Sequence, residues 1–332
     1  MPFNIIRNDI VNMNVDVIVN AANPELKQGG GVSGRIFEAA GVQAMTEACD
    51  ALGRCEFGKA IITPAFNLPA KAVIHAVGPV WQGGNQGEKE LLRSAYRSSL
   101  ELAKQYGFES IAFPLISSGK FGFPYESAFE IALDEINRFL LEEDLAVTLV
   151  VFDNTATAMA KFRNKDLISY INDHYVDEHL DTNRQRYLRD RPEALDVAFS
   201  AIPMPPNQLS ASEAKIDFPE EITFSDALLA FVDAKGMTDP EVYKRSNIDR
   251  THFSKIRSDK YYNPKKTTVL ALAIGLKLNL RESKDLLARA GYAFSPCDKR
   301  DVIVKYFIER GEFDIMKVNG ALFDHDQRLL GY

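Results

Sequence analysis

The chain has few cysteines, few histidines and no long apolar run. Its 332 residues include three cysteines and five histidines. The cysteines are odd in number and form no C-x-x-C pair, which excludes a disulfide framework and favours a reducing compartment. No apolar run approaches the ~20 residues of a membrane-spanning helix, and the first residues lack the apolar segment of a signal peptide. We therefore expect a cytoplasmic protein with no membrane contact, no metal site and no cofactor.

Length and charge indicate more than one part. A chain of 332 residues is long for one small domain and predicts two. The formal net charge is −7, but it is unevenly distributed, with −5 over residues 1–170, −6 over 171–221 and +4 over 222–332. The acidic total therefore hides a basic C-terminal part.

The first informative motif joins an apolar run, a glycine loop and a helix. Residues 15–19 predict a buried strand, which ends at a polar turn carrying Asn20 and Asn23. Three glycines follow at 29–31, and a helical pattern begins at Val32. Glycines let backbone N–H groups approach a phosphate, and a helix N-terminus favours negative charge. The loop lacks the Gly-Lys-Ser/Thr of a P-loop and the spaced glycines of a dinucleotide fold, so it predicts another kind of anion cradle.

A second glycine loop has the same local order. Residues 110–116 predict a strand that leads into S-S-G-K-F-G-F-P at 117–124, and a helical pattern follows. Four residues of this loop offer backbone donors at a strand-to-helix junction: Ser117, Ser118, Gly119 and Gly122. Two such loops on one sheet predict a ligand with two phosphates at the carboxyl ends of the strands.

Strand and helix patterns alternate in the first half of the chain and become all-helical in the last third. The expected strands are 3–6, 15–19, 59–64, 72–76, 110–116 and 146–152, and the expected helices are 32–40, 42–52, 87–106, 124–143 and 155–172. This alternation predicts a three-layer α/β/α fold with a mixed sheet. Residues 173–221 predict a linker with a short helix near 181–198 and a proline-rich end. Residues 222–332 predict a separate all-α domain, with helices near 225–235, 239–245, 250–258, 265–278 and 281–290 and two or so more after 297.

On these motifs, residues 1–172 resemble the macrodomain family, which binds ADP-ribose. The matching segments are 8–11, V-N-A-A-N at 19–23, G-G-G-V at 29–32 and S-S-G-K-F-G at 117–122. The resemblance implies that Asp9 accepts a hydrogen bond from the adenine amino group, Phe152 packs on the adenine and Asn23 binds the distal ribose. It implies that the glycine loops hold the diphosphate and that Phe121 covers the distal ribose. The expected ligand-binding residues are Asp9, Ile10, Asn20, Asn23, Gly29, Gly30, Gly31, Val32, Ser117, Ser118, Gly119, Lys120, Phe121, Gly122 and Phe152.

The chain departs from this family at two positions that bear on catalysis. Many hydrolytic macrodomains have G-G-G-V-D-G-x-I-H, whereas this chain has Ser33 and Phe37 in place of the Asp and the His. An unassisted serine does not activate water as a carboxylate does. We expect Asn23 and Gly30 to be the catalytic residues, with a substrate phosphate holding the attacking water. Two functions stay open: an enzyme that removes ADP-ribose from protein or nucleic acid, and a non-catalytic ADP-ribose reader.

Residues 222–332 resemble a helix-turn-helix domain of the phage-repressor type, in which a segment like I-D-R-T-H-F-S-K-I-R, at 248–257, opens the recognition helix. Ile248, Phe253 and Ile256 are expected to face the core. The expected nucleic-acid contacts on the outer face are Arg250, Thr251, Lys255 and Arg257. Residues 244–266 carry eight basic side chains against two acidic ones, which favours a phosphate-contacting surface. The partner of this region is expected to be DNA or a protein.

Several of these patterns also have purely structural explanations. As less favoured alternatives, Asn23 would only cap a turn, Phe152 would be a core aromatic residue and Phe121 would pack its own loop. Lys120 and the basic run would then be solvated charges. The positions of these side chains in the folded protein bear on each alternative.

Overall fold

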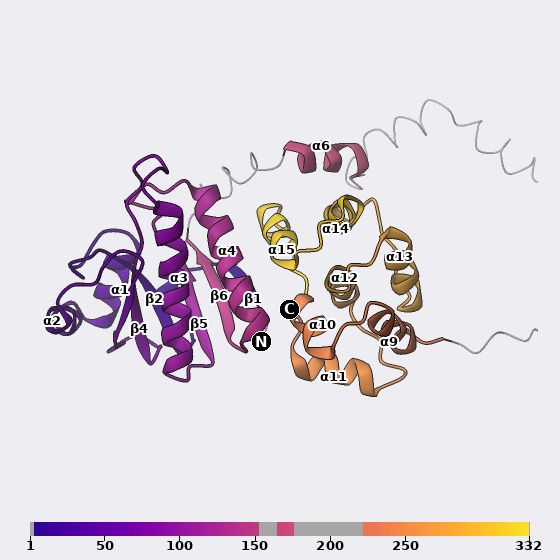
Figure 1. The fold of residues 1–332 in the computed structure, drawn as a ribbon, viewed down its shortest axis with the longest axis horizontal. Helices are drawn as coiled ribbons and strands as arrows, with labels where there is room; N and C mark the ends of the chain where they lie inside the picture. Colours follow the sequence, from indigo (N-terminus) through magenta and orange to yellow (C-terminus); the bar gives the residue numbers. More distant parts are fainter. Residues whose placement is uncertain (1–2, 153–164, 176–221, 332) are drawn as a thin grey trace, which may run out of the picture.

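The computed structural model describes residues 3–152, 165–175 and 222–331. Figure 1 shows an α/β part built by the N-terminal residues beside a helical part built by the C-terminal ones. The predicted helix at 181–198 and the proline-rich segment lie outside the described residues. The predicted helix at 155–172 is described only from residue 165, where α6 (Lys165–His174) begins.

A six-stranded mixed sheet forms the centre of the α/β part. Its strand order is β1-β6-β5-β2-β4-β3, with β3 antiparallel to β4 and the other neighbouring pairs parallel. The strands are β1 (Phe3–Arg7), β2 (Val17–Ala22), β3 (Ala60–Pro64), β4 (Ala72–Val77), β5 (Ser110–Pro114) and β6 (Ala146–Val151). The predicted mixed α/β sheet is therefore confirmed.

Helices cover both faces of the sheet because successive strand side chains point to opposite sides. Val17 and Val19 of β2 belong to the core under the long helices, whereas Ile18 belongs to the core under the two short ones. The helices are α1 (Val32–Ala40), α2 (Val42–Leu52), α3 (Glu88–Gln105) and α4 (Tyr125–Glu142), and the short 3-10 helix η1 (Ile10–Asn12) follows β1. The predicted three layers are present, with α1 and α2 on one face and α3 and α4 on the other.

The second strand ends three residues later than the sequence pattern predicts. The pattern placed its end at residue 19 and assigned Asn20 to a turn, but β2 continues to Ala22. Asn20 lies inside the strand and is buried. The expectation was wrong because the Asn20 side chain has a buried partner, the imidazole of His75 on the neighbouring strand β4. A polar residue with a buried partner does not end a strand.

The C-terminal residues are helical, as predicted, including two helices after residue 297. Several N-termini are capped by side chains, for example by the reciprocal Thr223–Asp226 and Thr238–Glu241 bonds. The helices are α9 (Phe224–Ala234), α10 (Asp239–Arg245), α11 (Arg250–Ser258), α12 (Lys266–Gly275), α13 (Leu280–Arg289), α14 (Lys299–Arg310) and α15 (Ile315–Asp324). Their buried side chains form one continuous cluster with those on the α3 and α4 face of the sheet. The division into separate domains stays a prediction.

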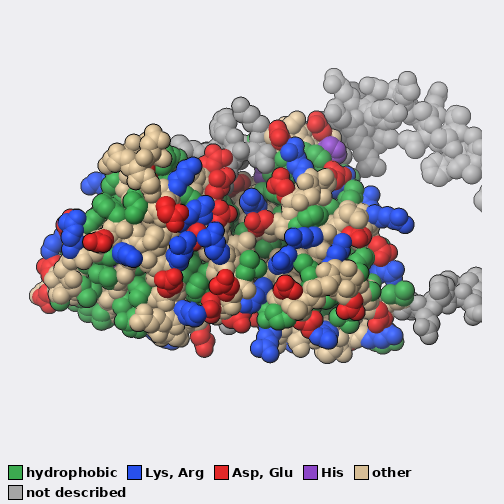
Figure 2. Space-filling view, in the orientation of Figure 1, with side chains coloured by type: hydrophobic (Ala, Val, Ile, Leu, Met, Phe, Trp, Pro, Cys, Tyr) green, Lys and Arg blue, Asp and Glu red, His purple; other side chains and the backbone are tan. Residues whose placement is uncertain are grey.

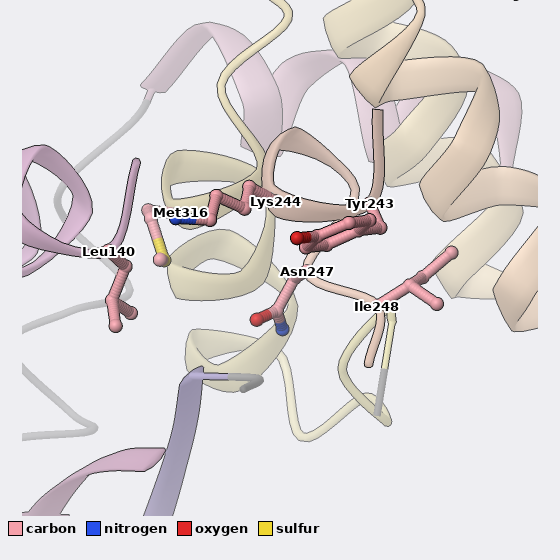
Figure 3. A pocket seen from close by; sticks show the side chains of 6 residues that line it. All are labelled: Leu140, Tyr243, Lys244, Asn247, Ile248 and Met316. Atoms are coloured by element: carbon pink, nitrogen blue, oxygen red, sulfur yellow. The ribbon is translucent and has the colours of Figure 1, made fainter. Parts of the chain in front are cut away.

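The helical part packs against α4 and the free edge of β1. Gly320 of α15 brings that helix close to the Phe129 and Leu133 side chains of α4. Asn247, in the turn between α10 and α11, donates to the Phe3 carbonyl at 3.0 Å and accepts from the Phe3 N–H at 2.6 Å. Figure 3 shows Asn247 with Leu140 of α4 on one side and Tyr243 and Ile248 of the helical part on the other. The pocket that these side chains line has a volume of only about 10 Å³. The side-chain amide thus satisfies backbone groups that an edge strand otherwise exposes.

No helix among the described residues is long and apolar enough to cross a membrane.

Candidate functional site

Five parallel strands bring the predicted ligand residues to one edge of the sheet. Parallel strands end on the same side, so the segments that follow β1, β6, β5, β2 and β4 converge there. Asp9 follows β1, and Phe152 follows β6. The two glycine loops follow β2 and β5. The sequence predicted each segment by itself, and the sheet order brings them together.

Glycine is required at two positions, one in the first glycine loop and one in the helix α1 that follows it. Gly31 has φ +61° and directly precedes α1, a backbone conformation that L side chains rarely adopt. A Cβ at Gly34 would lie 2.8 Å from the Gly29 carbonyl oxygen, so only glycine permits this close approach of helix and loop. Gly30 and Gly31 are exposed, whereas Gly29 and Val32 are partly buried. Gly30 and Gly31 therefore expose their backbone to solvent at the start of a helix, as the binding of an anion by backbone N–H groups requires.

The second glycine loop is held in a strained conformation. Ser117 has φ +63°, and its hydroxyl is buried with no hydrogen-bond partner in the described structure. The loop closes through a 3.0 Å bond from the Phe123 N–H to the Ser117 carbonyl and a 2.9 Å bond from the Gly122 N–H to the Gly119 carbonyl. Gly119 and Lys120 are exposed, and Ser118 is partly buried. Strain of this kind in a non-glycine residue is typical of ligand-binding loops.

Asp9 and Phe152 lie at the end of the site nearest the edge strand β1. One Asp9 carboxylate oxygen accepts from the Val11 N–H at 3.2 Å, and the other accepts from the Arg35 guanidinium at 2.8 Å. The neighbouring Ile10 is buried. The Phe152 ring is 69% exposed, which excludes the alternative that it is a core residue. The two residues follow neighbouring strands, and an exposed aromatic ring and a carboxylate are groups suited to stacking and hydrogen bonding with a heterocycle.

Asn23 closes a turn and still has hydrogen-bonding capacity. Its side-chain N–H donates to the Lys27 carbonyl at 2.8 Å, and its side-chain oxygen accepts from the Lys27 N–H at 3.0 Å. A primary amide has two donors and two acceptor lone pairs, so a ligand hydroxyl can be bound in addition. The structural explanation for Asn23 therefore holds, and it is compatible with ribose binding. Phe121 is partly buried, and its carbonyl accepts from the Trp81 N–H at 2.8 Å.

Neither Ser33 nor Phe37 is arranged for acid–base chemistry. The Ser33 hydroxyl is buried and accepts from the Gly29 N–H at 3.3 Å, so it holds the glycine loop. Phe37 is fully buried, with its ring 6.3 Å from that of His75 in an edge-on arrangement. The replacement of the family's Asp and His thus yields packing and loop support rather than a catalytic pair.

A buried polar network around His75 was not predicted. His75 contacts the Asn20 amide nitrogen at 3.1 Å and the Thr63 hydroxyl at 2.8 Å, and the Cys49 sulfur lies 3.9 Å away. Burial lowers the pKa of His75 to about 4 and raises the pKa of the Cys49 thiol to about 11. Both groups are neutral at pH 7, so neither is a nucleophile or a charged acid there. Sequence spacing gave no signal, because the partners lie on different elements.

His75 makes stability depend on pH. Above pH 6.5 the His75 side chain is neutral in both the folded and the unfolded protein. As the pH falls from 6.5 to about 4, the unfolded chain takes up a proton that the folded chain resists. We expect His75 to remove on the order of 3 kcal/mol from the free energy of unfolding over that window. Urea unfolding of the wild type and His75→Asn at several pH values checks this, because only the wild type carries the titrating group. Parallel stability profiles would contradict it.

Glu88 supports the loop between β4 and α3 and was also missed. Its buried carboxylate accepts from the backbone N–H groups of Gln82, Gly84 and Gln86 at 3.1, 3.0 and 2.7 Å. Hydrogen bonds from backbone N–H groups, its own included, lower its pKa. This loop carries Trp81, whose ring packs on Phe123 at 4.7 Å. Glu88 thereby holds a loop that packs against the second glycine loop, and in sequence it looks like an ordinary helix start.

The expected nucleic-acid residues face outward, but part of the basic cluster is neutralised. Ile248, Phe253 and Ile256 are buried, and the expected contacts Arg250, Thr251, Lys255 and Arg257 are exposed, so the predicted orientation of α11 is confirmed. Four basic side chains of the 244–266 cluster have acidic partners from other segments: Lys244 with Asp144, Arg257 with Asp239, Lys260 with Asp226 and Lys266 with Asp301. Figure 2 shows Lys and Arg side chains interspersed with Asp and Glu over the helical part.

Within the described ranges, no group of three His, Cys, Asp or Glu side chains could hold a metal ion. The geometry defines a three-layer α/β protein with two glycine loops at the carboxyl edge of its sheet.

Part of the chain is similar in sequence to known proteins. The Macro domain family matches residues 19–132. A Macro domain-containing protein of Methanosarcina mazei is 53% identical over 145 residues, which cover 44% of this chain and 77% of that protein. An O-acetyl-ADP-ribose deacetylase of Enterobacter cloacae is 50% identical over 155 residues, which cover 45% of this chain and 86% of that protein. A solved structure of the Oceanobacillus iheyensis macrodomain with MES bound is 39% identical, covers 50% of this chain and 91% of its own, and has a TM-score of 0.46. The chain therefore belongs to the Macro domain family.

Proposed function

We propose that this chain binds ADP-ribose at the carboxyl edge of its sheet and hydrolyses a bond at the distal ribose. The observation that carries the proposal is the convergence of two glycine loops, Asp9 and Asn23 at one edge of the sheet, where they follow the ends of the parallel strands β1, β5 and β2. The loops offer backbone donors for two phosphates, and Asp9 and Phe152 offer an acceptor and an aromatic face for adenine. The similarity to a protein named O-acetyl-ADP-ribose deacetylase supports an ester of ADP-ribose as a substrate.

The hydrolysis we propose uses the substrate's own phosphate. Water adds to the acyl carbon, the bond to the ribose oxygen breaks, and acetate and ADP-ribose leave. Asn23 fixes the ribose hydroxyls, and the Gly30 backbone, together with the bound diphosphate, holds the water. Ser33 takes no part in proton transfer because its hydroxyl is engaged with the glycine loop and no basic side chain is in contact with it in the described residues. An ester that joins ADP-ribose to a protein carboxylate would react in the same way, with that carboxylate leaving in place of acetate. For ADP-ribose attached to nucleic acid, water would add to the anomeric carbon of the distal ribose, and the nucleic acid would leave with the proton.

Two measurements on the full chain test this function. Calorimetry with ADP-ribose measures binding, and chromatography measures ADP-ribose released from O-acetyl-ADP-ribose and from mono-ADP-ribosylated protein. Binding with release supports the enzyme. Binding without release supports a reader, which the uncharged Ser33 and Phe37 positions favour. No detectable heat with ADP-ribose would refute both.

A second proposed activity is nucleic-acid binding by the helical part. The observation in its favour is the exposed face of α11, where Arg250 and Lys255 form no ion pair with another described residue. Phosphate contacts release counterions, so binding would weaken steeply with salt.

We expect Arg250→Glu with Lys255→Glu to abolish duplex binding by the full chain in a low-salt anisotropy titration. Arg281→Glu with Lys284→Glu is the matched control, because both side chains are exposed on α13 and the double substitution changes the net charge by the same amount. If the wild type does not bind duplex DNA at low salt, this part of the proposal fails and a protein partner is favoured.

A further inference from the structure

We propose that the C-terminal helical part sets the affinity for the adenine end of the ligand through Arg7, a positioning residue for Asp9. This inference rests on the proposed function and adds a role for the helices that the ADP-ribose site alone does not contain. Arg7 is the last residue of β1, and Asp9 follows two residues later. Any displacement of the end of β1 therefore moves the Asp9 carboxylate.

The Arg7 guanidinium is held by α15 and the turn that ends it. It forms an ion pair with Asp326 at 2.7 Å, donates to the Phe323 carbonyl at 3.3 Å and lies 4.4 Å above the centre of the Phe323 ring. The Phe323 carbonyl is one of the last in α15, so the cation also sits at the negative end of the helix dipole. An ion pair, a hydrogen bond and a cation–π contact thus all hold the Arg7 side chain against α15.

The turn at the end of α15 fixes the direction of the Asp326 carboxylate. The Gln327 N–H donates to the Leu322 carbonyl at 2.8 Å, and the Asp326 N–H donates to the Phe323 carbonyl at 3.1 Å, a pair of bonds that defines a Schellman motif. Asp326 has φ +58° and occupies the position where glycine is commonest. An aspartate there contributes a carboxylate in a defined place, and that carboxylate pairs with Arg7.

The other end of β1 is held as well, so the strand has little freedom to shift. Asn247 bonds to both backbone groups of Phe3, and β6 pairs with β1 from Phe3 to Arg7. In that register Arg7 is opposite Val151, the residue before Phe152. The helical part therefore contacts the site at the same end as the proposed adenine contacts, and Figure 1 shows α15 beside this edge of the sheet.

Arg7 and Asp326 are partly exposed, with 31% and 63% of their side chains accessible, so the ion pair alone contributes little to stability. The effect we expect is therefore local, on the placement of Asp9, rather than on folding. Asn8 lies between Arg7 and Asp9 in the chain, and its side-chain oxygen accepts a hydrogen bond from the Asp9 N–H at 2.8 Å.

The test compares full-length variants at the two ends of the interface. We expect Arg7→Ala and Asp326→Ala each to weaken ADP-ribose binding by about fivefold or more, a typical coupling between sites. The matched control is Lys244→Ala, which breaks contacts with Leu141 and Asp144 across the same interface but at the amino edge of the sheet. The control should bind as the wild type does, and urea unfolding checks that all variants are folded.

Two readouts separate positioning from other roles. If Arg7 acts through Asp9, then Arg7→Ala has no further effect in an Asp9→Ala background, and the loss disappears for an analogue with hypoxanthine in place of adenine, which lacks the amino group. If Arg7 instead binds the ligand directly, Asp326→Ala raises the affinity, which overturns the inference. Wild-type affinity in both single variants also overturns it. Failure of the wild type to bind ADP-ribose is a different result, which refutes the proposed function itself.

Discussion

Replacement of Asn23 by alanine is expected to lower the turnover of O-acetyl-ADP-ribose by about 100-fold. The amide is proposed to fix the distal ribose, and misplacement of a reacting group by about 1 Å can cost a factor of that size. The same substitution removes the two bonds to Lys27, so the 23–27 turn also loses its closure. Single-turnover release of ADP-ribose measures the rate, and calorimetry measures the affinity separately.

Ser33→Ala is the matched control for this experiment. It removes one 3.3 Å bond to the Gly29 N–H and no proposed catalytic group, so we expect turnover within a few fold of the wild type. The proposed mechanism would be wrong if Ser33→Ala abolished turnover while Asn23→Ala retained it, because the serine would then be the residue that activates water.

Asp9→Ala is expected to weaken ADP-ribose binding at least tenfold. A hydrogen bond to a charged acceptor contributes on the order of 1.5–3 kcal/mol, and each ~1.4 kcal/mol is a factor of ten in affinity. The Asp9 carboxylate already accepts from Val11 and Arg35, but a carboxylate has about four acceptor positions, so the adenine amino group can be added. Calorimetry with ADP-ribose gives the change in the dissociation constant.

Asp134→Ala serves as the matched control for Asp9→Ala. Asp134 is a half-exposed carboxylate on α4 that pairs with Arg93, so its removal changes the net charge equally without touching the proposed site. Equal losses in the two variants would show that only long-range charge matters, and an unchanged affinity in Asp9→Ala would remove Asp9 from the adenine site.

The sequence by itself determined the local parts of the site. Contiguous glycines between an apolar run and a helical pattern predicted both loops, because backbone freedom and helix initiation depend on neighbouring residues. It also determined the departures at Ser33 and Phe37 and the inward face of α11, since both follow from residue identity and helical period. The domain boundaries and the roles of the site residues remain predictions.

Only the tertiary structure decided which distant residues contact these segments. Asn20 was assigned to a turn because the local pattern does not reveal its partner, His75, which is 55 residues away on the neighbouring strand β4 of the sheet. The local charge of residues 244–266 was counted from the sequence as eight basic against two acidic side chains. In the structure, four aspartates from other segments also lie close to this region: Asp144, Asp226, Asp239 and Asp301. Arg7 reads as an ordinary strand end until α15, more than 300 residues later, is placed beside it. A window of sequence records composition, whereas hydrogen bonds and ion pairs depend on distance in space, and folding sets that distance independently of separation along the chain.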